Sequence, residues 1–134
     1  MVDRVSATLT EVMDGLAALA TTALGTSTNV YAYPVEAISV PCVVVGYPTV
    51  IDFDPTYGGG IAWSLPVWHV VGKVTTKSAR DDLSDIVGTL RTALNAAHTF
   101  GAAASDVRCE DGEIATMAVG GVEYLALKYT VHVI

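Results

Sequence analysis

The sequence has few basic residues and few cysteines. Seven lysines and arginines stand against 14 aspartates and glutamates among 134 residues, which gives a formal net charge of -7. A general nucleic-acid binder needs cations to displace counterions from phosphates, so this balance argues against that class. Cys42 and Cys109 lie in apolar, strand-like contexts and are expected to be small buried thiols. Neither has a second Cys or a His nearby in the sequence, so no metal site is expected.

Long apolar runs are also missing. The longest candidates, residues 40–46 and 65–72, contain Pro, His or Gly and fall well short of the roughly 20 residues that a membrane-spanning helix needs. The first residues lack the basic patch and apolar run of a secretory signal. We therefore expect a protein that is made in a cytoplasm and has no membrane contact.

Catalytic signatures are absent as well. No serine stands in a Gly-x-Ser-x-Gly elbow, and the glycine triplet 58–60 lacks the Gly-Lys-Ser/Thr ending of a phosphate loop. The three histidines are far apart in the sequence. A small-molecule enzyme or binding domain would have to gather His69, His132, Asp52 and Asp54 in one pocket, and this stays open as a lower alternative. The main expectation is a protein without catalytic residues, cofactor or metal.

Apolar side chains are plentiful. They make up 51% of the residues, and the mean hydropathy is +0.48. The length suits one compact domain over residues 1–134. A monomer of this size leaves an unusual amount of apolar surface to hide, and burial between subunits is one way to hide it.

Two helices are expected from apolar residues spaced by three and four. The first covers residues 3–24, with Asp3 as a plausible N-cap and Gly25 just past the end. The second covers residues 78–97, opened by Ser78 in a sequence that resembles a capping box.

The remaining segments are expected to be extended. Strands are expected at residues 30–33, 40–46, 49–53, 61–74, 105–110, 113–119 and 122–133. Asp111-Gly112 is predicted to turn a hairpin and Gly120-Gly121 the next one. Pro66 cannot donate to a ladder, which indicates a sheet edge or a bulge. In the last strand the odd positions are expected to face the core. The element order predicts an α+β fold: a mainly antiparallel sheet with two helices packed on one face.

Four passages, taken in order, suggest a family. The first is the Ala- and Leu-rich helix 9–24, and the second is Val-Tyr-Ala-Tyr-Pro at 30–34 with Val-Pro-Cys-Val-Val-Val-Gly-Tyr-Pro at 40–48. The third is the Asp- and Gly-rich loop 52–60 leading into Trp-Ser-Leu-Pro-Val-Trp-His-Val-Val-Gly at 63–72. The fourth is Ser-Ala-Arg-Asp-Asp-Leu at 78–83. Together they resemble the tail terminator proteins of long-tailed, siphovirus-type bacteriophages, particularly those of actinobacterial hosts. The resemblance covers nearly all of the chain.

The resemblance implies a structural virion protein. Terminators of this kind are small α+β domains that form homohexameric rings, cap the finished tail tube and end its polymerisation. Their partners are further copies of the chain, the tail tube protein and the head–tail connector or neck protein, while DNA only passes through the ring. The expected location is the head-proximal end of the tail, after assembly in the host cytoplasm. Another neck or tail-completion protein and a tail tube subunit remain alternatives.

If the chain is a tail terminator, two sets of residues are expected to take part in its assembly. An acidic lumen would repel DNA phosphates. The acidic, glycine-rich loop is therefore predicted to face the lumen or the tube, through Asp52, Asp54, Tyr57, Gly58, Gly59 and Gly60. Aromatic residues are enriched at subunit contacts, which makes Phe53, Trp63 and Trp68 interface candidates.

Overall fold

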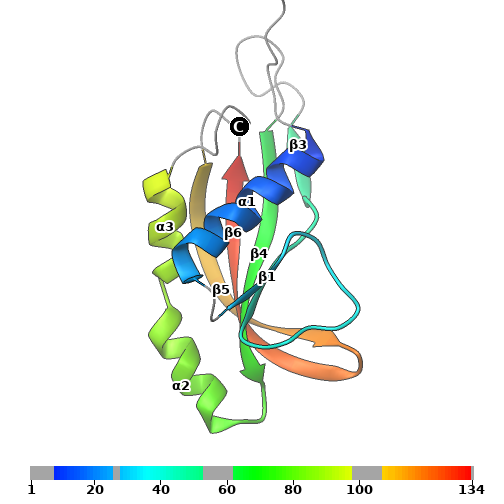
Figure 1. Ribbon diagram of the computed structural model, residues 1–134, viewed down its shortest axis with the longest axis vertical. Helices are drawn as coiled ribbons and strands as arrows, with labels where there is room; N and C mark the ends of the chain where they lie inside the picture. Colours follow the sequence, from blue (N-terminus) through cyan, green and yellow to red (C-terminus); the bar gives the residue numbers. More distant parts are fainter. Residues whose placement is uncertain (1–7, 26–27, 53–61, 98–106, 134) are drawn as a thin grey trace, which may run out of the picture.

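The computed structural model describes residues 8–25, 28–52, 62–97 and 107–133 (Figure 1). Its elements are α1 (Leu9–Leu24), β1 (Asn29–Tyr31), β2 (Cys42–Val45), β3 (Val50–Asp52), β4 (Ala62–Lys73), α2 (Lys77–Ile86), α3 (Thr89–Ala97), β5 (Val107–Val119) and β6 (Val122–Val133). The strands form one sheet in the order β1-β2-β4-β6-β5, with β3 also paired to β4. Only the β1–β2 pair is parallel among these strands. The predicted α+β fold with a mainly antiparallel sheet is confirmed.

The first helix starts later than expected. Thr8 is its N-cap: the Thr8 hydroxyl accepts a hydrogen bond from the Glu11 amide at 3.2 Å, and the Glu11 carboxylate accepts one from the Thr8 amide at 2.9 Å. This reciprocal capping box satisfies two amides that the helix itself leaves unpaired. Asp3, the expected N-cap, lies outside the described residues. The expected end is confirmed, because Gly25 follows α1 with a φ of 74°.

The single helix expected over residues 78–97 is wrong, because two helices occupy this range. Thr76, and not Ser78, caps α2 by accepting a hydrogen bond from the Ala79 amide at 3.3 Å. Gly88 separates α2 from α3 with a φ of 85°, a conformation that interrupts a right-handed helix. The apolar stripe continues across this break, which is why spacing alone predicts one helix.

The hairpin predicted at Asp111-Gly112 is also wrong. Both residues lie within β5 and pair with Thr130 and Tyr129 of β6. The ladder has a register shift between Cys109 and Asp111, so the sequence that resembles a turn follows an irregularity inside a long strand. The turn is at Gly120-Gly121, as predicted, where φ values of 59° and 80° suit a two-residue hairpin.

The main core joins the helices to one face of the sheet. Buried side chains of α1, α2 and α3 belong to one cluster with side chains of β2, β4, β5 and β6. Figure 1 shows α1 lying across the sheet and α3 beside β5. In β6 the predicted core positions Leu127, Tyr129, Val131 and Val133 are buried in this cluster.

A smaller cluster covers part of the opposite face of the sheet. Its buried members are Cys42, Val44, Val70 and Ala126. Partly buried side chains from β1, the following loop, β4, β5 and β6 pack against it: Tyr31, Ile38, Trp68, Met117 and Tyr124. The central strand β4 therefore has apolar contacts on both faces, as its sequence predicts.

Pro66 lies in the interior of the sheet, at a break in the neighbouring strand. It pairs with Thr130 of β6 on one side. On its other side β2 has ended and β3 has not begun, and the Pro66 carbonyl accepts a hydrogen bond from Gly46 at 2.8 Å. The missing proline N–H therefore costs the sheet little, and Pro66 lies at an interruption of the neighbouring strand, which agrees with the predicted edge or bulge.

Within the part of the chain described here, no helix is both long and apolar enough to cross a membrane.

Candidate assembly surface

The predicted lumen loop begins and ends on neighbouring strands. Asp52 is the last residue of β3 and pairs with Ala62, the first residue of β4. Phe53, Asp54, Tyr57, Gly58, Gly59 and Gly60 lie outside the described residues. Their assignment to the lumen or to a subunit contact stays a prediction.

The two tryptophans lie on opposite faces of the sheet. Trp63 belongs to the main core and is 7% exposed, and its indole N–H has no hydrogen-bond partner within the part of the chain that the structure describes. Trp68 is half-buried beside the smaller cluster, with the Lys128 ammonium 5.3 Å from its ring centroid. This cation–π contact and the core packing account for both residues within one subunit. Their proposed role in subunit contacts stays a prediction.

The structure does not bring His69 and His132 together. His132 pairs with Ser64 of β4, and its Nδ1 lies 3.2 Å from the Ser64 hydroxyl. His69 stands five positions further along the same regular stretch of strand, so its side chain points to the opposite face. The pocket required by the lower alternative therefore cannot contain both histidines.

His69 lies at a hollow between β4 and α2. It is 2% exposed, its Nδ1 has no hydrogen-bond partner among the described residues, and burial lowers its pKa below the usual 6.5. The hollow has a volume of about 380 Å³ and is lined by Leu24, Thr28, Pro41, His69, Val71, Asp82, Asp85 and Ile86. Nowhere in the described ranges do three or more His, Cys, Asp or Glu residues gather to hold a metal ion. A neutral, buried imidazole next to helix α2 is what this arrangement provides.

Both cysteines are buried free thiols, as predicted. Burial raises the pKa of Cys42 to about 11. Burial is also the largest of the effects on Cys109, whose pKa is raised to about 11. Thiols of this kind are poor nucleophiles at neutral pH.

Exposed apolar side chains gather around β3. We use the name β3-edge patch for five exposed side chains: Leu9 (39% exposed), Tyr33 (59%) and Tyr47 (58%), which line one hollow, and Val50 (58%) and Ile51 (40%), which point to opposite faces of β3. In the view of Figure 1, the first turns of α1 overlap β3 and the start of β4. Large apolar groups exposed together are typical of a surface that another molecule covers.

Among the described residues, no strand pairs with the outer backbone edge of β3, which ends at Asp52. Its pairing within the described chain is with β4 alone, and Val50 and Ile51 carry no charge. Unpaired edge strands can hydrogen-bond a second chain, and proteins usually guard them with charges, bulges or covering groups.

The opposite edge of the sheet, β5, has protecting features of this kind. The Cys109 amide donates to the Asn95 side-chain oxygen of α3 at 2.9 Å, so the helix covers the edge there. The ladder irregularity follows directly, and Glu110, Asp111 and Glu113 place charges along the strand. The contrast between the two edges makes the β3 side the candidate assembly surface.

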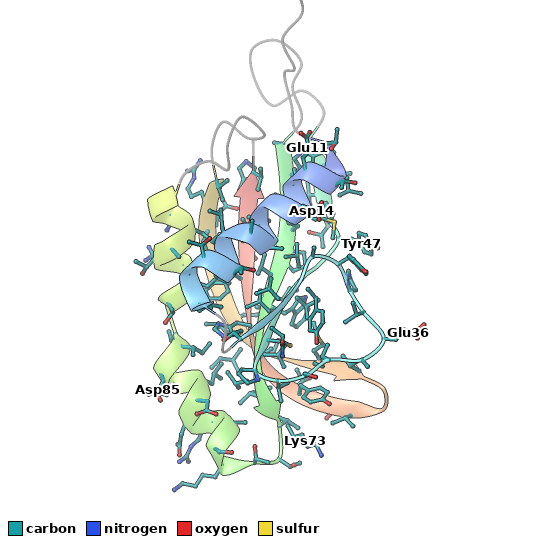
Figure 2. All side chains as sticks on the ribbon, viewed as in Figure 1. Glu11, Asp14, Glu36, Tyr47, Lys73 and Asp85 are labelled. Carbon is teal, nitrogen blue, oxygen red and sulfur yellow. The ribbon has the colours of Figure 1, made fainter. Side chains whose placement is uncertain are left out.

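A hollow adjoins the β3-edge patch. It has a volume of about 200 Å³ and is lined by Leu9, Thr10, Met13, Asp14, Ala32, Tyr33 and Tyr47. Figure 2 shows Asp14 and Tyr47 on the same side of the molecule, with Lys73 and Asp85 toward the other end. We call this the Asp14 hollow. Its walls are apolar and aromatic, and Asp14 supplies its one acidic side chain.

Neither a protein-family model nor a curated protein matches the chain.

Sequence reasoning did not identify the β3-edge patch. Val50 and Ile51 resemble core residues of any buried strand, and only the strand pairing shows that β3 is an edge strand with exposed side chains. The concentration of tyrosines in the first half of the chain was a partial signal, because Tyr is enriched at subunit contacts.

Proposed function

We propose that this chain is the subunit of a closed homomeric ring, and that the ring is the tail terminator of a long-tailed bacteriophage. The observation that carries the proposal is the β3-edge patch, a set of exposed apolar side chains on and around an edge strand in which Val50 and Ile51 carry no charge. An isolated subunit would leave this surface open to aggregation, whereas a ring covers it once in every subunit.

A head-to-tail ring requires each subunit to have two different contact surfaces, because one surface of each subunit binds the other surface of its neighbour. The sheet supplies two unlike sides. One carries β3 and its apolar patch, and the other carries β5, whose edge is guarded and partly covered by α3. This asymmetry favours a head-to-tail ring over a two-fold dimer.

The particular role follows from the resemblance described above. The ring would cap the tail tube, stop its polymerisation and present the docking face for the head–tail connector, with six copies as the expected number. The net charge of -7 fits a passage for DNA, since a negative wall repels phosphates. The role requires no catalysis and no cofactor.

The test is the mass and shape of the purified protein, measured by light scattering and negative-stain images over a range of concentrations. Closed rings, or rings that form when tail tubes are added, would support the proposal. Long tubes formed by the protein alone would make it a tube subunit. A monomer that never caps added tubes would contradict the proposal and favour another neck protein.

A further inference from the structure

We propose that Val87 and Arg91 of one copy of this chain dock into the Asp14 hollow of the next copy. This inference rests on the proposed ring and names the contact that would hold neighbouring subunits together. It joins two surface features that a single subunit leaves without partners: an apolar hollow with one carboxylate, and an exposed apolar side chain beside an exposed cation.

The receiving side is suited to an arginine. Tyr33 and Tyr47 line the Asp14 hollow with aromatic rings, on which a guanidinium can stack. Asp14 is exposed, and it forms no ion pair with any residue that the structure describes. A carboxylate at the rim of an aromatic hollow offers a guanidinium both charge pairing and apolar contact.

The inserting side is the junction of α2 and α3. Val87 is 60% exposed, although it is apolar. Arg91 lies four residues further on, in the first turn of α3, and is also exposed. It makes no hydrogen bond or ion pair to the described residues, and its charge partly offsets the burial that raises the pKa of the Cys109 thiol. Arg91 therefore lies on the β5 side of the molecule.

The two sides are placed for a head-to-tail contact. The sheet order puts β5 at the edge opposite to β1, and β3 lies on the β1–β2 side of β4. The Asp14 hollow includes residues of the β3-edge patch, while Arg91 lies near Cys109 of β5 and Val87 precedes it at the junction of α2 and α3. Opposite charges on opposite sides of identical subunits attract head to tail and repel head to head. This complementarity is why a second copy is the occupant that we assign to the hollow.

Four other cations of the described residues fit less well. Arg80 is already paired with Asp81 at 3.1 Å, and Lys128 lies 3.8 Å from Glu113. Lys73 and Lys77 flank the turn before α2, at the end of the molecule away from the Asp14 hollow (Figure 2).

The experiment compares charge reversals at the proposed contact with matched reversals elsewhere. Asp14→Arg and Arg91→Asp are the test variants, and their combination restores the pair with exchanged signs. Glu123→Arg and Lys77→Asp are controls with the same changes of charge at exposed positions outside the contact. Assembly is measured by sedimentation velocity, or by the mass bound at tube ends if the wild-type ring closes only there. Circular dichroism checks that each variant is folded.

We expect each test variant to weaken assembly about tenfold or more, because a reversed charge meets a like charge in the contact. The double variant is expected to recover most of the wild-type assembly, and the controls to assemble as the wild type does. Rings that survive both single reversals, or a double variant no better than the singles, would overturn the contact while leaving the ring itself standing. A wild-type chain that stays monomeric with and without tubes would overturn both the contact and the proposed function.

Discussion

The close approach of Gly46 and Pro66 gives a sharp test of how β2 leads into β3. A Cβ at position 46 would lie 2.7 Å from the Pro66 Cγ and 3.1 Å from the Pro66 carbonyl oxygen. The first distance is shorter than carbon atoms tolerate, and the proline ring has little freedom to move because Pro66 pairs with Thr130 of β6 and its carbonyl accepts a hydrogen bond from Gly46. Gly46→Ala is therefore expected to force the chain away from β4.

The magnitude follows from two opposing effects. Replacing glycine by alanine without strain usually stabilises a protein by about 0.4–1 kcal/mol, through the unfolded chain. Overpacking a tight interior site costs about 1–3 kcal/mol. The clash should dominate, so we expect Gly46→Ala to lower the free energy of unfolding by about 1–2 kcal/mol.

The assay is urea unfolding at one fixed protein concentration, with a matched control and a double-mutant cycle. Gly112→Ala is the control, because the nearest atom to its added Cβ would be the Leu127 Cδ1 at an ordinary 3.5 Å. Pro66→Ala removes the ring atom that clashes and should recover part of the loss caused by Gly46→Ala, while the contact with the carbonyl oxygen remains. Strictly additive effects, or a Gly46→Ala protein as stable as the control, would refute this reasoning.

Three further predictions concern single side chains. Because burial lowers the pKa of His69, protonation of this residue favours the unfolded chain. The contribution of His69 to stability should be full above pH 6.5, and the free energy of unfolding should fall by up to about 1.4 kcal/mol per pH unit below it. His69→Gln should remove this part of the pH dependence when unfolding is measured at pH 7.5 and 5.5. Asn95→Ala leaves the Cys109 amide without its partner and should cost about 1–2 kcal/mol, so unchanged stability would contradict the role of Asn95 as an edge cover. Cys42 and Cys109 should react with a thiol reagent at pH 8 far more slowly in the native protein than in urea, and equal rates would contradict their burial.

Much of the fold could be predicted because local signals agreed with the pairing. The apolar spacing of α1, the core positions of β6 and the turn at Gly120-Gly121 all follow from short stretches of sequence. The failures occurred where two local signals competed. Asp111-Gly112 is as good a turn sequence as Gly120-Gly121, and only the long ladder with β6 decides between them.

The candidate assembly surface depends on long-range structure and was harder to predict. Val50 and Ile51 become exposed because β2 and β3 share one side of β4 and β3 ends that side of the sheet. Nothing within three residues of either position indicates this. The Asp14 hollow likewise joins residues of α1 to loops after β1 and β2, which the sequence does not show to be neighbours.

The most direct test of the central claim is the length distribution of tail tubes assembled in vitro with and without this protein. We predict that the wild-type chain binds tube ends and stops elongation, giving short tubes with a ring at one end. A chain with Val50→Lys and Ile51→Lys should lose this effect, because two charges would guard the β3 edge. Tubes that grow equally long with and without the wild-type protein would contradict the account.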